Sequence, residues 1–252
     1  MQALKFTLKG RTAFFKKPDV NAHLYFTYGH IHKVSLLGIF GAALGYKGYN
    51  QMKDNENFPE FYDKLKDLKI GIVSNNKCGV IDKKVNIFNN SVGYASKEKG
   101  GNLIVKEQWL ENPSWDIYVL LDNDESEKLS KAILNKNYKF IPYLGKNDHM
   151  AEILNVSIEE CEEIDEINNI DSFFIKEDYV LVEKELDPFL DYDEEDNYEA
   201  EPLFKYEEKL PIKLDEVNNL YILKTLVYTN NFLEEINRGN VYKVNNKTVQ
   251  FL

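Results

Sequence analysis

The first strongly patterned segment of the chain alternates between apolar and polar residues. From Leu4 to Leu8 the apolar residues are Leu4, Phe6 and Leu8, with Lys5 and Thr7 between them. A period of two places the apolar side chains on one face of a β-strand and the polar side chains on the other. The pattern therefore predicts a half-buried strand.

The spacing changes to that of a helix within the segment Thr27–Gly48, where the apolar residues from Val34 to Leu44 recur every three or four positions and predict one buried helix. Gly38 and Gly41 lie inside this pattern, where each costs roughly 1 kcal/mol relative to alanine. We expect close packing against a sheet, or the close approach of a ligand, at these two positions. Gly45 follows the last periodic residue and is a typical helix stop.

Further elements continue the N-terminal half in the same manner. They are a short amphipathic helix over 58–66 and strands over 68–74, 115–122 and 138–144, with a helix over 126–135 that Asn123 or Asp124 begins. The resulting order is the βαββαβ arrangement of a ferredoxin-like or RRM-like domain, in which both helices cover one face of the sheet. The predicted fold class is α+β, with this domain spanning residues 1–155.

Residues 75–110 have a different composition from the predicted core elements. Short apolar islands are separated by Asn, Gly and Ser, and the lysines there include Lys77, Lys83, Lys84, Lys97 and Lys99. This is typical of an extended β-hairpin that projects as an arm and contacts nucleic acid. An ordinary exposed loop would also be rich in lysine.

The remainder, residues 156–252, is acidic and predicted to be mostly β. Residues 151–169 are acidic and mildly helical in pattern, and 187–201 form a low-complexity acidic run that we interpret as a flexible excursion. Strands are predicted over 179–183, 206–214, 220–228 and 241–252, the last with a hairpin turn at Asn245 and Asn246.

The net charge of −11 is distributed unevenly between the two halves. Residues 1–150 hold 22 Lys and Arg against 16 Asp and Glu, whereas residues 151–252 hold 9 against 26. A basic half suits a polyanion, and an acidic half would repel one. We therefore expect the second half to face protein or solvent, although a charge run such as 159–166 can also be a solvated surface alone.

Basic and aromatic residues are interleaved directly after the first strand. Arg11, Lys16 and Lys17 flank Phe14 and Phe15. Such a segment can neutralise a phosphate backbone and stack a base, but two adjacent phenylalanines can equally be one core and one edge residue.

Three of the four histidines, His23, His30 and His32, precede the predicted buried helix. Such a cluster can form a catalytic site or bind a metal ion. No carboxylate lies among these histidines at ligand spacing, so we expect no metal site. The alternatives are that they cap the helix or contact an anion at its N-terminus, where Lys33 would assist.

Neither cofactor chemistry nor membrane insertion is indicated elsewhere. Cys78 and Cys161 are far apart and lack a CxxC partner, so we expect reduced thiols and no zinc. The sequence has no apolar run of about 18 residues and no signal peptide pattern at residues 1–10. We expect a cytoplasmic protein with no cofactor.

Three segments together resemble a known family. The basic first strand, TYGHIHKVSLLGIFGAALG from Thr27, and YKFIPYLGKNDHMAEI from Tyr138 resemble Cas family five, the RAMP-superfamily subunit of type I CRISPR effector complexes (Cascade). The resemblance covers residues 1 to about 155, and the chain length and acidic inserts are similar to those of the type I-B branch.

This resemblance implies a non-catalytic subunit that binds the 5′ handle of the CRISPR RNA in antiviral and anti-plasmid defence. It implies a position between the large subunit and the backbone RAMP subunits, with target DNA engaged only through the complex. The candidate RNA-binding residues are Lys9, Arg11, Lys16, Lys17, His30, His32, Lys33, Ser35, Lys83, Lys84, Lys97, Lys99 and Lys146.

An alternative function is a repeat-specific endoribonuclease that processes precursor CRISPR RNA. One branch of the family uses Tyr, Lys and His as acid, base and charge stabiliser. His23, His30 or His32, with Tyr28 or Tyr46 and Lys33, are the residues that could take this role.

Overall fold

The protein is built around a six-stranded antiparallel sheet with β1 near its middle. The computed structural model describes residues 1–252 except 20–22, 165, 183–201 and 238. The strand order is β14-β13-β7-β1-β6-β3, comprising β1 (Gln2–Lys9), β3 (Ile70–Ser74), β6 (Ser114–Leu120), β7 (Glu152–Glu163), β13 (Asn240–Val244) and β14 (Lys247–Phe251). The alternating pattern of β1 is confirmed, because Leu4, Phe6 and Leu8 are fully buried.

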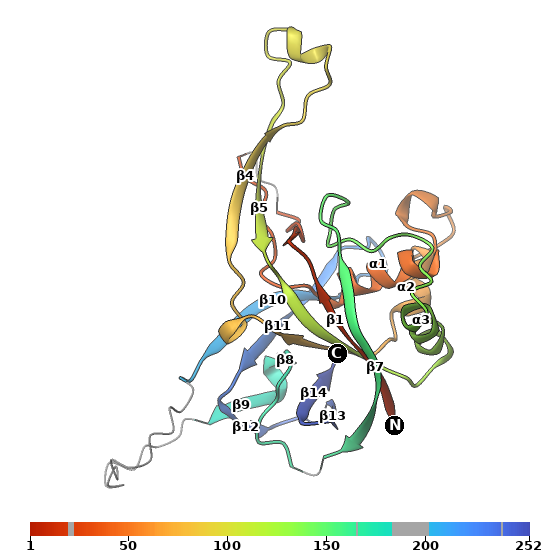
Figure 1. Cartoon of the computed structure of the whole chain (residues 1–252), viewed down its shortest axis with the longest axis vertical. Coiled ribbons are helices and arrows are strands. Elements are labelled where there is room, and N and C mark those ends of the chain that lie inside the picture. The colour runs from red at the N-terminus through yellow and green to blue at the C-terminus, as the bar shows by residue number, and fades with distance from the viewer. Residues whose placement is uncertain (20–22, 165, 183–201, 238) are drawn as a thin grey trace.

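Three helices cover one face of this sheet (Figure 1). They are α1 (Lys33–Leu44), α2 (Glu60–Leu65) and α3 (Asp124–Leu134). Phe40 of α1 packs edge-on against Phe6, with ring centroids 6.2 Å apart. Asn123 caps α3, as predicted, by accepting a hydrogen bond from the Ser126 N–H.

The buried helix begins where the sequence predicted, with Lys33 in its first turn. The residues before Lys33 are extended, and Tyr28 N–H donates to the Phe15 carbonyl at 2.8 Å. The predicted stop is confirmed, since Gly45 has φ of 81° and its N–H donates to the Ala42 carbonyl.

Gly41 allows α1 to approach α2 closely. A Cβ at this position would lie 2.3 Å from the Phe61 Cβ, which no real side chain tolerates. The predicted close packing therefore exists, but it is made against a helix rather than a sheet.

The C-terminal hairpin β13–β14 extends the sheet beyond β7, and the sheet curls so that this hairpin packs over the face opposite the helices. Val249 and Phe251 pack there in one cluster with Ala3, Tyr118 and Leu120. The end of β14 returns to β3, where the Ile70 and Leu252 main chains exchange hydrogen bonds at 3.3 and 3.0 Å. Asn245 adopts φ of 55° in the turn, at the predicted hairpin position.

Two of the predicted elements were wrong. The described residues 138–144 form no strand and contribute one isolated bridge, between Tyr143 and Met150. The strand that pairs with β1 on the edge opposite β6 is β7. The sequence did not predict this strand, because the pattern of 151–169 is acidic and helix-like. The pairing of β7 with β1 and β13 overrides the low strand propensity of glutamate. The predicted boundary at residue 155 lies inside β7.

The rest of the C-terminal part forms two smaller sheets. One has the order β10-β11-β8 and the other pairs β12 with β9, comprising β8 (Phe174–Ile175), β9 (Tyr179–Val182), β10 (Lys205–Leu214), β11 (Tyr221–Thr229) and β12 (Phe232–Glu235). These bounds confirm the predicted strands over 206–214 and 220–228, and the strand predicted over 179–183 as far as the described residues extend, to Val182. The acidic run 187–201 lies outside the described residues.

A two-stranded hairpin projects far beyond the body of the protein (Figure 1). We call it the thumb: β4 (Lys83–Asn89) and β5 (Ile104–Glu111) pair along their whole length, and short β2 (Thr12–Ala13) joins β5 at the base. The projecting hairpin predicted over 75–110 is confirmed. The described residues also contain four single turns of 3-10 helix, at Tyr49–Gln51, Lys77–Gly79, Ala95–Lys97 and Lys176–Asp178.

Candidate nucleic-acid interface

A trough runs across the N-terminal half of α1 to the base of the thumb. It consists of three adjoining cavities: one beside Tyr143, a middle one beside Glu107, and one beside Tyr49. The cavity beside Tyr143 shares Ser35 and Gly145 with the middle cavity. The middle cavity shares Lys16, Tyr25 and Tyr221 with the cavity beside Tyr49. The lining of the trough is aromatic and basic, with residues Phe14, Lys16, Lys17, Tyr25, Tyr49, Tyr143, Lys146 and Tyr221. Aromatic faces and lysines along one groove are what single-stranded nucleic acids bind.

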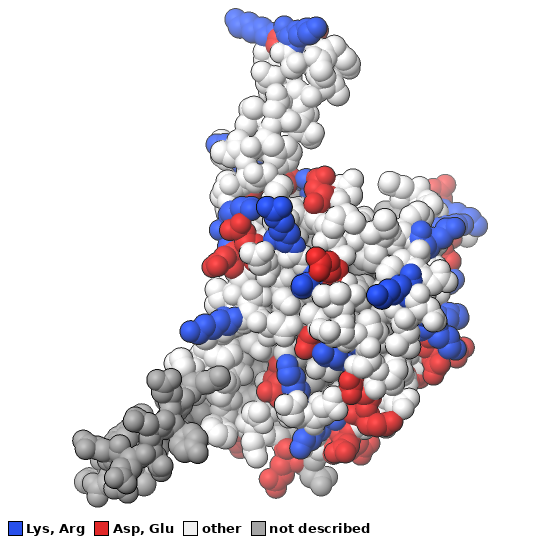
Figure 2. Space-filling model, in the orientation of Figure 1, with Lys and Arg blue, Asp and Glu red and all other residues white. Residues whose placement is uncertain are grey.

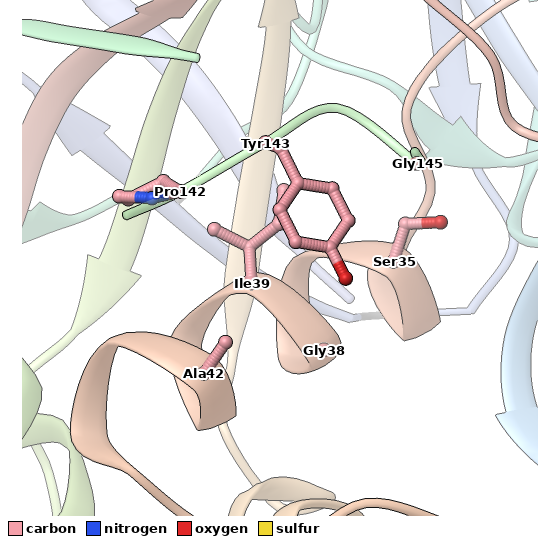
Figure 3. Close-up of a pocket in the computed structure, with 7 residues that line it drawn as sticks. All are labelled: Ser35, Gly38, Ile39, Ala42, Pro142, Tyr143 and Gly145. Atoms are coloured by element: carbon pink, nitrogen blue, oxygen red, sulfur yellow. The ribbon is translucent and has the colours of Figure 1, made fainter. Parts of the chain in front are cut away.

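One end of the trough is a cavity of about 210 Å³ between α1 and the segment containing Tyr143 (Figure 3). The Tyr143 ring lies over the helix between Ile39 and Ser35. A Cβ at Gly38 would meet no heavy atom of the described residues within 4 Å. Packing inside the protein therefore does not account for this mid-helix glycine, in contrast to Gly41.

The turn after Tyr143 depends on Gly145. This residue has φ of 90°, and a Cβ there would lie 1.9 Å from the Phe14 carbonyl oxygen. Only glycine fits such a conformation and such a close approach. The turn directs Lys146 toward the base of the thumb, where its Nζ lies 3.0 Å from Glu107 Oε1 and 5.6 Å from the centre of the Phe14 ring.

The other end of the trough is built on Tyr25. Its main chain runs beside β5, with the Tyr25 N–H donating to the Lys106 carbonyl and the Gln108 N–H donating to the Tyr25 carbonyl, both at 2.9 Å. Lys16 Nζ lies 3.8 Å from the centre of the Tyr25 ring. Lys17 instead forms an ion pair with Glu208 at 3.1 Å. Of the two lysines, Lys16 is the one whose charge faces the groove.

His30 is a structural residue. It is fully buried, and its Nδ1 accepts a hydrogen bond from Trp115 Nε1 at 3.0 Å, so Nε2 carries the ring hydrogen and donates it to the Gly79 carbonyl at 2.6 Å. Burial lowers the pKa of His30 to about 4. A neutral ring with both nitrogens engaged and no exposed surface does not reach an RNA phosphate, which corrects the prediction for this residue.

His32 serves as the N-cap of α1, which is the capping role considered for it in the sequence. Its Nδ1 accepts from the Ser35 N–H at 3.2 Å, and Nε2 lies 2.9 Å from Ser35 Oγ. Burial lowers the pKa of His32 to about 3, so the ring is neutral. Although it borders the trough, only 1 % of it is exposed. Ser35 is the half-buried member of this pair and lines the trough.

Lys33 points away from the trough. It is buried, and its Nζ donates to the main-chain oxygen of Leu252 at 2.9 Å. Burial lowers the pKa of Lys33 to about 8. The anion-binding role predicted for this lysine is thus replaced by a link between α1 and the end of β14.

The other predicted lysines and Arg11 lie outside the trough. Lys9 pairs with Glu152 at 3.5 Å, and Arg11 is exposed beyond the end of β1. Lys83 and Lys84 are at the start of β4, and Lys84 pairs with Glu111 at 2.7 Å. Figure 2 shows positive charge at the tip and at the base of the thumb and little along its shaft, where Val85, Ile87 and Ile104 are exposed. Lys97 and Lys99 belong to the tip.

Sequence reasoning missed several residues of the trough. Tyr221 lies in the acidic half, which the charge distribution assigned away from nucleic acid, and Glu107 lies in the thumb, where only the lysines were considered. Tyr143 was assigned to a strand. Its position two residues before Gly145, within YLGK, was a local signal of a turn.

Known proteins share this fold without sharing much sequence. No family model and no curated protein matches significantly. A chain of a CRISPR RNA-guided surveillance complex superposes with a TM-score of 0.50 at 13 % identity, covering 92 % of this chain and 91 % of that one. A CRISPR protein from Archaeoglobus fulgidus superposes with a TM-score of 0.50 at 10 % identity, covering 99 % and 98 %. The chain has the fold of these CRISPR proteins.

Two further properties concern the described part of the chain. None of its helices has the length and apolar character needed to cross a membrane. No three His, Cys, Asp or Glu side chains there come close enough to hold a metal ion.

Proposed function

We propose that this chain is a non-catalytic, CRISPR RNA-binding subunit of a cytoplasmic type I effector complex. More specifically, we assign it to Cas family five, of the RAMP superfamily, and to the type I-B branch. Its role is to hold the 5′ handle of the CRISPR RNA and to connect the large subunit with the backbone RAMP subunits. The shared fold supports a place in CRISPR defence, and the motifs described above support the family.

The central four strands support a ferredoxin-like domain. Taken in chain order, β1, β3, β6 and β7 are the first to fourth strands, and their spatial order β7-β1-β6-β3 corresponds to 4-1-3-2. This is the order that a split βαβ arrangement produces when its helices lie on one face. The thumb is inserted between the second and third of these strands.

The observation that carries the proposal is the trough at the base of the thumb. It combines exposed aromatic rings, Tyr49, Tyr143 and Tyr221, with the cationic groups of Lys16 and Lys146. Stacking on aromatic side chains is worth about 1–3 kcal/mol per base, and the lysines supply the salt-dependent attraction to phosphates. A continuous groove of this kind is suited to several successive nucleotides.

The endoribonuclease alternative has less support. His30 and His32 are buried with lowered pKa values, so neither exchanges a proton with a substrate near neutral pH. Of the basic residues considered with them, Lys33 is bound to the main chain of Leu252. His23 is the exposed one of the three histidines that were considered as catalytic residues. We therefore propose binding without cleavage.

Co-purification tests this proposal directly. The tagged chain is expressed with the other proteins encoded beside a CRISPR array, and the bound RNA is sequenced. We expect discrete RNAs with a common 5′ end, and an intact labelled repeat RNA after incubation with the purified chain. Protein that emerges without RNA, or with RNA of random ends, would overturn the binding role. Specific cleavage of the repeat RNA would overturn the non-catalytic role.

A further inference from the structure

Glu107 is a buried carboxylate among the basic and aromatic residues of the trough, which Asp19 also lines at another point. It lines the middle cavity of the trough with Tyr25 and Tyr221, although only 5 % of the residue is exposed. Trp109 Nε1 donates to its Oε2 at 2.8 Å. Lys146 Nζ lies 3.0 Å from Oε1 and 3.1 Å from Oε2. Phosphate binding alone gives no reason for a negative charge at this point.

The two partners of Glu107 differ in their freedom to move. Trp109 lies in β5, and its ring packs edge-on against His149 with centroids 4.6 Å apart, so it fixes the carboxylate plane. The Lys146 side chain is 34 % exposed and follows the Gly145 turn. A carboxylate offers about four lone-pair sites. If the ammonium group swings aside, both oxygens can accept a further hydrogen bond.

We propose that this cavity is a guanine-selective subsite for one nucleotide of the bound RNA. The inference rests on the proposed RNA-binding function and adds a base specificity to it. Guanine is the one standard base whose Watson–Crick edge has two adjacent donors, N1–H and the N2 amino group, which match the two Glu107 oxygens. The adjacent O6 is an acceptor, and it receives a hydrogen bond from the displaced Lys146 ammonium group.

The same pair of side chains rejects the other bases. Adenine and cytosine each present one amino donor beside a ring nitrogen acceptor, so one carboxylate oxygen would face a lone pair. Uracil presents its single N–H between two carbonyl acceptors. In each case a buried acceptor of Glu107 is left opposite another acceptor, which is costly in a site shielded from water. Tyr25 and Tyr221 contribute stacking, which every base can accept.

A direct binding experiment tests the subsite. Fluorescence anisotropy measures the affinity of the full chain for 10-nucleotide oligo(U) RNAs that carry guanosine, adenosine, cytidine or inosine at one central position. Inosine has the O6 and N1–H of guanosine but lacks the N2 amino group. We expect the guanosine RNA to bind about tenfold more tightly than each of the others, which corresponds to one good bidentate base contact.

Matched variants separate base selection from general affinity. Glu107→Gln, which turns one acceptor into a donor, is expected to reduce the guanosine preference below about twofold. Glu107→Asp keeps the charge but withdraws the carboxylate and should have the same effect. Lys16→Ala is expected to weaken all four RNAs equally, because it removes a phosphate contact. A thermal melt of each variant monitors folding.

Each possible result is decisive. Equal affinity of the wild-type protein for all four RNAs would overturn the subsite and leave the proposed function intact, with the Glu107–Lys146 pair serving only to hold the Gly145 turn. A guanosine preference that survives in a folded Glu107→Gln or Glu107→Asp protein would also overturn it. Failure of the wild-type protein to bind any RNA would overturn the proposed function together with the subsite.

Discussion

The His30 ring is held neutral between Trp115 and the Gly79 carbonyl. A proton on Nδ1 would break the hydrogen bond from Trp115 and would place a charge in the interior of the protein. Its pKa in the folded protein, about 4, lies below the ordinary value of 6.5. Unfolding releases the ring to bind a proton more readily. Its contribution to stability is therefore fully present above pH 6.5 and is lost as the pH falls toward 4.

A pH comparison tests this assignment. From pH 7.5 to pH 5, His30 should lower the free energy of unfolding by about 2 kcal/mol, and His32 should add a similar amount. His30→Gln should be less stable than wild type at pH 7.5, because it loses packing, but its stability should fall less on acidification. Urea denaturation at the two pH values measures both effects. An identical pH dependence in the variant and wild type would show that His30 is not held neutral.

Gly38 and Gly41 offer a matched pair of substitutions in one helix. At Gly38 an added methyl group meets open space among the described residues, so Gly38→Ala should raise the free energy of unfolding by up to about 1 kcal/mol through helix propensity. Gly41→Ala should lower it, because the methyl group would clash with Phe61. Urea denaturation of both variants provides the measurement. Destabilisation by both substitutions would mean that Gly38 is tightly packed.

The thumb is the element in which charge and core can be separated by mutation. Replacing Lys83, Lys84, Lys97 and Lys99 by Ala should reduce the affinity for CRISPR RNA and flatten its salt dependence. Each lost phosphate contact lowers the slope of log K against log salt by about 0.7. The melting temperature should change little, since these lysines are exposed and a surface ion pair such as Lys84–Glu111 contributes at most about 1 kcal/mol. The affinity for RNA is measured as a function of salt concentration for the wild type and the variant, together with a thermal melt of each. An unchanged slope with a strongly lowered melting temperature would show that these lysines stabilise the fold and do not bind RNA.

Helices and strands with a regular spacing of apolar residues were predictable from the sequence. Elements whose structure depends on pairing or packing with distant segments were not. The alternation at Leu4–Leu8, the glycine stop at Gly45 and the Asn245 turn each act locally, so the sequence revealed them. By contrast, β7 is rich in glutamate, and its strand structure comes from pairing on both sides. Residues 138–144 have a strand-like composition, but Tyr143 forms a single bridge and its segment instead covers α1.

The site was less predictable than the fold for the same reason. Lys16 and Lys146 were found from charge and lie in the trough, whereas His30, His32 and Lys33 were predicted to contact RNA and their side chains are buried. The aromatic half of the trough joins Tyr25, Tyr143 and Tyr221 from segments far apart in the chain. No local pattern brings such residues together, because their proximity depends on how the thumb base, α1 and β11 pack.

At the scale of the whole molecule, the two chemically different halves share one core. The acidic second half supplies β13 and β14 to the sheet and Leu252 to the Lys33 link, and Val249 packs against the face formed by residues of the first half. Burying Val244, Val249 and Phe251 contributes about 1.5–3 kcal/mol for each side chain. The three contributions together are comparable to the free energy of unfolding of a typical domain. The halves should therefore unfold together.

Two substitutions of valine by aspartate test this cooperativity. Val249 is fully buried and Val217 is 92 % exposed. Val249→Asp places an unpaired carboxylate in the shared core, so we expect it to destabilise the first and second halves alike and to abolish RNA binding through loss of the trough. Val217→Asp should melt as the wild type does. Calorimetry would show one transition for the wild type and a single transition at a much lower temperature for Val249→Asp. If the variant instead showed two transitions, one of them at the wild-type temperature, the chain up to the end of β7 would be an independent domain and the hairpin β13–β14 an accessory to it.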